Sequence, residues 1–289
     1  MAAAGPDIGA AESDRQIRYN RRMRLAFTAL AAFCSLTTSA PAQWINYPTA
    51  GIPRTADGQP NLSAPAPRTA QGKPDFSGMW RAADPLPCDG INRVCGDLAI
   101  SVQFGNLGVG LKDGVPYQPW ASEKIKNKGL TDDPYTNCLA RGGPRMHLLP
   151  TMKKLVQTPN LIVILDEYNA SFRQIFTDGR PLPVDPQPTW NGYSTGRWEG
   201  DTLVVDSIGY RDDQWLDARG SPLTEVGKVT ERFRRPNLGN LEIEVTINDP
   251  KAYTRPWTAT IRQTAVLDTE LLDLICLENE KDVAHLTVK

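Results

Sequence analysis

Carboxylates and arginines on strand-like segments supply the most reactive side chains of this chain. Glu231 lies between Val229 and Phe233 at the spacing of alternate strand residues, so it faces the core if those two apolar side chains do. Burial raises the pKa of a glutamate and would suit Glu231 to general acid or base catalysis. The alternative is a structural ion pair at one end of the fold. The candidate partners are Arg173, Arg180, Arg197 and Arg262.

Two more carboxylates have similar positions. Asp206 shares a strand face with Val204 and Ile208, which predicts an inward side chain. Glu167 follows three apolar residues at alternate positions, Leu161, Val163 and Leu165, although strand ends often turn charged side chains outward. We therefore predict Glu231, Asp206 and Glu167 as catalytic residues.

Several arginines and aromatic residues are candidates for holding a substrate. Arg180 follows the turn Asp178-Gly179 and, like Arg197, could grip an anionic group with two hydrogen bonds. Tryptophan rings could line an apolar pocket, with core packing as the alternative. The predicted binding residues are Arg180, Arg197, Arg173, Trp190, Tyr193, Ser194, Trp198 and Trp215.

Other chemistries find little support in the sequence. His147 has no visible partner in the sequence, so we expect no hydrolase triad. No phosphate loop or dinucleotide fingerprint occurs. His147 and His285 stand apart, and no C-x-x-C pair occurs, so we expect no metal and no cofactor. With 32 basic and 33 acidic residues and no charged block in the mature region, nucleic acid is not an expected partner.

Strand-length apolar runs dominate from Lys154 onward. They are separated by turns such as Asp178-Gly179, Asn191-Gly192 and Glu199-Gly200-Asp201, without room for crossover helices before residue 268. This pattern predicts an antiparallel meander that closes into a lipocalin-like barrel, with a β-sandwich as the alternative. The expected strands are 155–158, 161–167, 172–177, 202–208, 228–234, 241–247 and 258–266.

Two local patterns refine this prediction. Leu241, Ile243, Val245 and Ile247 alternate with polar residues, as a sheet with one wet face requires. Gly78-x-Trp80 enters the first strand and Arg262 lies on the last one, which is similar to the opening signature of lipocalin-type barrels. A short helix is expected at 121–128.

The N-terminus has the features of an export signal. Arg21, Arg22 and Arg24 precede an apolar run, and Ala40-Pro41-Ala42 is a typical cleavage site. The run is shorter than the roughly 20 residues that span a bilayer, so no stable membrane anchor is expected. Met23 is an alternative start. We expect a signal region at 1–42, an extended arm at 43–74 and one β domain at 75–289, in a periplasmic or secreted protein.

Cysteine usage agrees with export. Cys34 leaves with the signal segment, and the remaining four cysteines allow three pairings. A local bridge between Cys88 and Cys95 is the simplest choice, which leaves Cys138 to pair with Cys276. Long-range closure of that kind stabilises a fold.

Several segments together resemble a largely uncharacterised family of secreted bacterial proteins. The segments are Pro74-Asp75-Phe76-Ser77-Gly78-Met79-Trp80, Asp178-Gly179-Arg180-Pro181, 196–206, Thr230-Glu231-Arg232-Phe233, Asp249-Pro250, Arg255-Pro256-Trp257 and Ile275-Cys276-Leu277-Glu278-Asn279. The resemblance implies secretion and a shared β architecture but no activity. Where relatives often carry histidine, this chain has Tyr193 and Leu223.

These observations favour a cofactor-independent acid/base enzyme, a lyase or isomerase rather than a hydrolase, acting on a small apolar or aromatic molecule. The alternative is a noncatalytic lipocalin-like binding protein of the periplasm. The two hypotheses differ in whether the carboxylates converge with arginines in a concave pocket.

Overall fold

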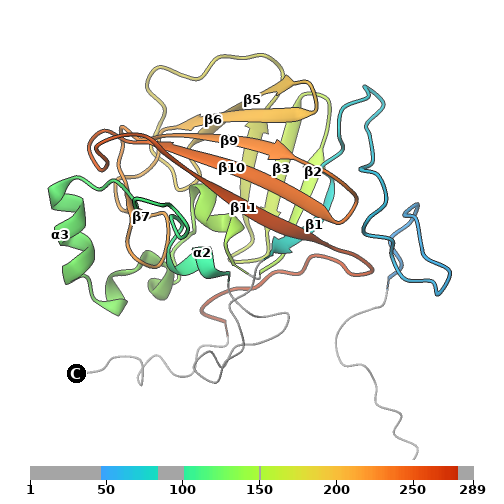
Figure 1. The fold of residues 1–289 in the computed structure, drawn as a ribbon, viewed down its shortest axis with the longest axis horizontal. Coiled ribbons are helices and arrows are strands. Elements are labelled where there is room, and N and C mark those ends of the chain that lie inside the picture. The colour runs from blue at the N-terminus through green and yellow to red at the C-terminus, as the bar shows by residue number, and fades with distance from the viewer. Residues whose placement is uncertain (1–46, 84–100, 150, 279–289) are drawn as a thin grey trace, which may run out of the picture. The chain divides into compact units, whose positions relative to one another are not determined.

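The computed structural model describes residues 47–83, 101–149 and 151–278, and these residues form a closed β-barrel (Figure 1). Neighbouring strands follow the order β1-β11-β10-β9-β6-β5-β4-β3-β2, and β2 pairs with β1 to close the ring. The prediction of a mainly β chain that closes into a barrel is confirmed. The strands are β1 Gly78–Ala82, β2 Lys153–Gln157, β3 Leu161–Asp166, β4 Ser171–Phe176, β5 Tyr193–Glu199, β6 Thr202–Ile208, β9 Lys228–Arg234, β10 Asn240–Asn248 and β11 Trp257–Val266.

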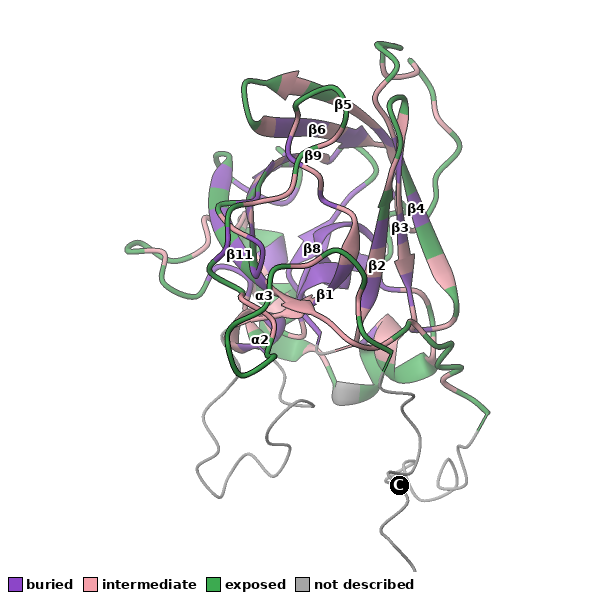
Figure 2. Ribbon diagram, turned by 90° about the vertical axis from the view of Figure 1, so that its right-hand side faces the viewer, coloured by how far each residue is buried: buried purple, intermediate pink, exposed green. Residues whose placement is uncertain are grey.

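Alternating side chains fill the barrel with one face of each long strand. In β10 the apolar residues Leu241, Ile243, Val245 and Ile247 are buried, and the residues between them are exposed or half-buried, as predicted. Figure 2 shows the same alternation of buried and more exposed residues along the strands. The buried side chains join one apolar cluster that fills the interior, as side chains do in small barrels.

One seam of the barrel departs from the predicted antiparallel meander. β4 and β5 run parallel and pair only at Ile175 with Ser194 and Phe176 with Thr195. The loop 177–192 returns the chain across the end of the sheet without a helix, so the prediction of antiparallel pairing throughout is wrong at this step. Strand β5 itself was not among the expected strands.

Short elements fill the connection between β1 and β2 and the long loop after β6. The helices are α2 Val102–Gly105 and α3 Pro119–Asn127, followed by the short helical turns η2 Leu130–Asp132, η3 Pro134–Asn137 and η4 Gly143–His147. The helix expected at 121–128 is therefore present as α3. A separate two-stranded sheet joins β7 Gln214–Trp215 to β8 Pro222–Leu223. None of the helices in the described segments is long and apolar enough to cross a membrane.

The arm preceding β1 belongs to the same compact unit as the barrel and contains two copies of one turn. Two segments of eight residues are identical at six positions; they are Pro53-Arg54-Thr55-Ala56-Asp57-Gly58-Gln59-Pro60 and Pro67-Arg68-Thr69-Ala70-Gln71-Gly72-Lys73-Pro74. In each copy the glycine N–H donates to the threonine carbonyl, and the arginine donates to the glycine carbonyl. The positive φ of Gly58 and Gly72 explains the glycine at that place.

Each turn is fastened to the barrel unit by its arginine. Arg54 forms a bidentate ion pair with Asp268, and Arg68 forms one with Asp201 in the hairpin between β5 and β6. The arm is therefore ordered by contacts with the rest of the unit, since its own short turns bury little apolar surface.

Trp80 in β1 packs against the guanidinium of Arg235, not against that of Arg262. The Arg235 guanidinium carbon lies 4.7 Å from the Trp80 ring centroid. Arg262 is exposed on the outer face of β11. Arg235 is the first residue after β9. It lies outside the strand pattern, so the sequence did not predict its contact with Trp80.

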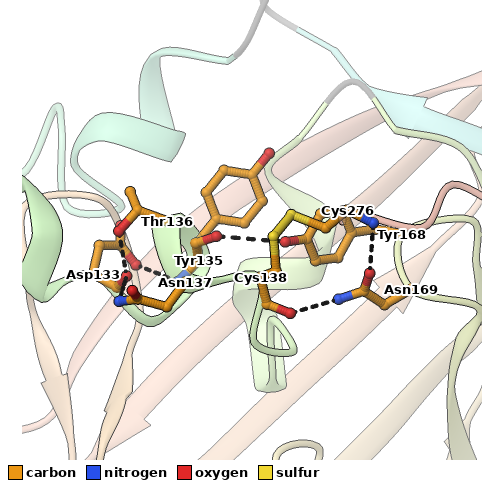
Figure 3. Close-up of a disulfide and its surroundings, with 8 residues drawn as sticks. All are labelled: Asp133, Tyr135, Thr136, Asn137, Cys138, Tyr168, Asn169 and Cys276. Atoms are coloured by element: carbon orange, nitrogen blue, oxygen red, sulfur yellow. Dashed lines mark hydrogen bonds between the residues drawn. A yellow bond between two sulfur atoms is a disulfide. The ribbon is translucent and has the colours of Figure 1, made fainter. Parts of the chain in front are cut away.

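A disulfide joins Cys138 to Cys276, as predicted (Figure 3). The Asn169 side chain fixes both half-cystines, because its amide nitrogen donates to the Cys138 carbonyl at 2.8 Å and its oxygen accepts from the Cys276 N–H at 3.0 Å. The segment after β11 is thereby tied to the loop between β3 and β4. The predicted bridge between Cys88 and Cys95 lies outside the described residues.

Removing the long-range disulfide is expected to destabilise the fold substantially. The bridge spans 138 residues, so the chain-entropy model predicts a loss of about 3–5 kcal/mol in unfolding free energy for Cys138→Ala combined with Cys276→Ala. Urea unfolding measures this loss. A reductant should reduce the difference in unfolding free energy between wild type and the double variant. An unchanged unfolding free energy in the double variant would contradict the prediction.

Candidate functional site

A pocket of about 490 Å³ lies where β4 and β5 separate. Its lining includes the outward-facing side chains of Phe172 and Gln174 together with the buried Arg173 and Ser194. The pocket therefore reaches from the outer face of the wall to two side chains that point into the barrel. The remaining lining residues are Ala140, Ala170, Ser171, Phe176, Thr189, Trp190, Asn191, Gly192 and Tyr193.

The Asn191-Gly192 turn sets the far wall of this pocket. Gly192 has a φ of +64°, and a Cβ there would lie 2.7 Å from the Ile208 carbonyl oxygen, so only glycine fits. Asn191 donates its side-chain amide to the Phe172 carbonyl at 2.8 Å and bridges the gap between the strands. The turn thus brings Trp190 and Tyr193 into the lining of the same pocket.

Stacked aromatic and guanidinium groups form the rim of the pocket. The rings of Phe176 and Tyr193 stack with centroids 5.3 Å apart, and Arg180 lies 4.0 Å from the Phe176 centroid. Arg180 also donates to the Tyr193 hydroxyl at 3.3 Å, while Asp178 neutralises its charge. On the other side Arg211 lies 4.8 Å from the Trp190 centroid. The rim is consequently aromatic, with partly compensated positive charge.

Behind the pocket, Arg173 forms a buried ion pair with Glu231. Nη1 donates to Oε1 at 3.1 Å and Nη2 donates to Oε2, and both side chains are at most 1% exposed. Arg173 also donates to Ser194 at 3.2 Å and to Ser207 at 3.0 Å. The predicted inward orientation of Glu231 is thus observed, and Arg173 is the partner among the four candidate cations.

The pair fixes Glu231 in its charged form. Burial alone would raise the pKa of this carboxyl, but the Arg173 charge and hydrogen bonds from His147 and Arg173 outweigh it and lower the pKa to about 2. The expectation of a raised pKa is therefore wrong for Glu231. At neutral pH the group is an ionised, paired carboxylate rather than a general acid.

His147 is a further member of this buried group that the sequence did not reveal. Its Nε2 lies 3.4 Å from Glu231 Oε1, and the Gln263 amide donates to its carbonyl at 3.0 Å. Burial lowers the pKa of His147 more than the neighbouring carboxylate raises it, so the ring is neutral at neutral pH. Because His147 is distant from Glu231 in the chain, only tertiary structure brings the two together.

Asp206 lies on the opposite face of the wall from Glu231. Glu231 pairs in register with Val205, whereas Asp206 pairs with Thr230. The Asp206 carboxylate binds Arg197 at 2.8 Å and Lys228 at 3.2 Å; Arg197 is exposed and Lys228 is half-buried. The prediction that Asp206 points inward is wrong, because Val204 and Ile208, with which it shares a face, belong to the outer face. Asp206 and Glu231 therefore do not share a site.

The other predicted site residues are spread over the molecule. Glu167 is half-buried just after β3 and accepts from the Met152 N–H at 2.7 Å; burial raises its pKa. Trp198 stacks on Phe76 at 5.5 Å. Trp215 is buried in β7. The structure brings Arg173, Arg180, Trp190, Tyr193 and Ser194 together and leaves Arg197, Glu167, Trp198 and Trp215 elsewhere.

A second buried charged group lies beside β2 and β3. Arg141 Nη2 is 3.5 Å from Asp166 Oδ1 and 3.1 Å from the Thr151 hydroxyl, and its guanidinium stacks 4.0 Å from the Tyr168 centroid. Lys153 pairs in register with Asp166, and burial lowers its pKa to about 8. In β3 the buried residues are Ile162, Ile164 and Asp166. The sequence pattern predicts that Glu167 continues the inner face, whereas the inward carboxylate is its neighbour Asp166.

Neither metal ligation nor known relatives define this site. No group of three or more histidine, cysteine, aspartate or glutamate side chains is placed to hold a metal within the described parts of the chain. Comparison with protein-family models, curated proteins and solved structures found no match to the chain. The site must accordingly be interpreted from its own geometry.

Replacing Glu231 by glutamine should destabilise the fold strongly. The change leaves the Arg173 guanidinium buried without a counter-charge, and such losses cost about 3–5 kcal/mol. Asp206→Asn, which removes a carboxylate from the outer face of the neighbouring strand, should cost about 1 kcal/mol or less. Chemical unfolding of both variants measures the contrast, and equal losses would argue against a special role for the buried pair.

The same pair predicts the acid sensitivity of the fold. The pKa of Glu231 is lower in the folded protein, about 2, than the ordinary value of 4.5, so its stabilisation is present above the ordinary value and disappears as the pH falls toward 2. Unfolding free energies measured between neutral pH and pH ~2 should show this loss in wild type. A Glu231→Gln variant with the same pH dependence would contradict it.

Proposed function

We propose that this chain is an exported, noncatalytic binding protein that holds a small aromatic molecule in the pocket between β4 and β5. The observation that carries the proposal is the aromatic lining of that pocket at an opening in the barrel wall, where Phe172 is 57% exposed. An exposed aromatic side chain beside a pocket of this volume is a typical small-molecule contact.

The buried charges behind the pocket favour binding over acid/base catalysis. Glu231 has no capacity to donate a proton near neutral pH, since its pKa is about 2. Asp206, which was predicted to act together with Glu231, lies on the other face of the barrel wall. Behind the pocket, Ser194 and Arg173 are each about 1% exposed and hydrogen-bonded to one another, and Glu231 compensates the Arg173 charge.

These groups favour a largely apolar ligand that carries one polar group. Phe172, Phe176, Trp190 and Tyr193 offer ring faces for stacking. The Asn191 side chain supplies the polar contact that orients a hydroxyl, because its buried oxygen has no hydrogen-bond partner in the described structure. A ligand with a full negative charge gains less, because the nearest cations already have carboxylate partners.

Export is supported by the signal-like N-terminus together with the disulfide. The bridge between Cys138 and Cys276 is of the kind that forms and persists in oxidising compartments such as the periplasm. The proposed site of action is therefore the periplasm or the external medium.

Replacing Phe172 should weaken ligand binding without harming the fold. The neutral fluorescent probe phenylnaphthylamine should bind saturably to wild type, and Phe172→Ser should weaken that binding roughly tenfold, the effect of losing about 1.4 kcal/mol of apolar contact. Probe fluorescence measures the affinity. Tyr47→Ser removes another exposed aromatic residue, one that does not line the pocket, and should bind like wild type.

The rival hypothesis of an acid/base enzyme makes a different prediction for the same protein. Incubation with extracts of the producer's growth substrates, followed by mass spectrometry, should recover an enriched ligand in unchanged form. Conversion of a compound by wild type that is lost in a folded Glu231→Gln variant would replace the binding proposal with the enzymatic one.

A further inference from the structure

A second pocket, of about 360 Å³, lies between the arm and the barrel and has three arginines in its lining. Arg68 comes from the second arm turn, and Arg234 and Arg235 come from the end of β9 and the residue after it. The only carboxylate in this lining is Asp201. The remaining lining residues are Pro65, Ala66, Pro74, Thr202 and Pro236, so three prolines and an alanine give the pocket a rigid apolar side.

Arg235 is a largely buried cation that has no carboxylate among its hydrogen-bond or ion-pair partners in the described residues. Its side chain stacks on Trp80, and the residue is only 8% exposed. Its hydrogen bonds to described residues all end on main-chain carbonyl oxygens, those of Asp75, Ser77, Asn237 and Leu238. A guanidinium has five N–H donors, so four such bonds leave capacity for one more acceptor. Burial lowers the pKa of Arg235 to about 10, and the charge of the Asp75 carboxylate offsets only part of this effect.

Arg234 is the most available cation of the pocket. Its side chain is 63% exposed, and its contact with the Glu242 carboxylate is long, at 3.9 Å. Arg68, in contrast, already has both nitrogens on Asp201, at 3.0 Å and 2.6 Å. The pocket therefore combines three kinds of arginine. Arg234 is loosely paired, Arg235 is buried and bonds main-chain carbonyls in the described structure, and Arg68 has a carboxylate that competes with any incoming anion.

We propose that this pocket binds the oxyanion group of a small organic acid, with Arg234 and Arg235 as its principal holders. Planar carboxylate and tetrahedral phosphate groups both match the donor fork of arginine. The proline walls fit the carbon skeleton that carries the anion. The site is separate from the aromatic pocket between β4 and β5, since the two share no lining residue.

Titration calorimetry with citrate and with inorganic phosphate, at constant ionic strength set by sodium chloride, tests the proposal. Wild type should bind citrate saturably. Arg234→Gln should weaken that binding about tenfold, as expected for loss of one charge-assisted hydrogen bond. Asp201→Asn should tighten it several-fold, because the change removes the competing carboxylate and frees Arg68. Binding of phosphate alone would assign the site to inorganic phosphate and overturn the organic acid.

Two matched variants separate the site from general charge effects. Arg232→Gln removes an arginine on the same strand that pairs with Glu199 and does not line the pocket. Asp268→Asn removes the carboxylate that pairs with Arg54 of the first arm turn, as Asp201 pairs with Arg68 of the second. Both should bind citrate within about twofold of wild type. Absence of saturable binding, an unchanged affinity in Arg234→Gln, weaker binding in Asp201→Asn, or equal effects in the matched variants would each overturn the proposal.

Discussion

The buried pair of Arg173 and Glu231 is the interaction on which the closure of the barrel depends. β4 and β5 share only two paired positions, so the backbone ladder is weakest there. Arg173 compensates from within, because its guanidinium binds Ser194 on β5, Ser207 on β6 and Glu231 on β9. One side chain thus links four consecutive strands of the wall. Since an isolated buried charge is costly, the guanidinium and its acceptors hold one another in place, and the seam stays closed on the inside while the outer face remains open.

This arrangement also explains why the aromatic pocket lies in the wall rather than in the centre of the barrel. The interior is occupied by packed apolar side chains and by the charged group around Glu231. Within the barrel wall, space for a ligand arises where β4 and β5 diverge, and that divergence follows from the parallel return of the chain through the loop 177–192. The Asn191-Gly192 turn ends that loop, and its tight approach to Ile208 fixes the pocket wall. A rigid wall of this kind reduces the ordering cost of binding.

The alternation of apolar and polar residues along a strand predicted which side chains face the barrel interior, except where apolar residues occupy both faces of the strand. β10 alternates cleanly, so its inner face was correctly predicted, and so was that of Glu231. In β6 both Val204 and Val205 are buried, so apolar residues alone did not distinguish the inner from the outer face, and Asp206 was placed on the wrong one. The pairing of His147 with Glu231 has no local signal, because it joins residues that are far apart in sequence. The parallel seam also escaped prediction, since loop length alone suggested an antiparallel return.

The duplicated arm turn marks the limit of what local sequence determines. Both copies fold with equivalent hydrogen bonds and each offers one arginine to one aspartate, so the repeat itself was available from the sequence. Their surroundings nevertheless differ, because only the second copy lies beside Arg234 and Arg235. The excess of positive charge there comes from the end of β9, not from the repeated segment. The first turn therefore only attaches the arm through Asp268, whereas the second turn, at Asp201, also forms one wall of a charged pocket. The difference comes from the part of the barrel that each turn contacts.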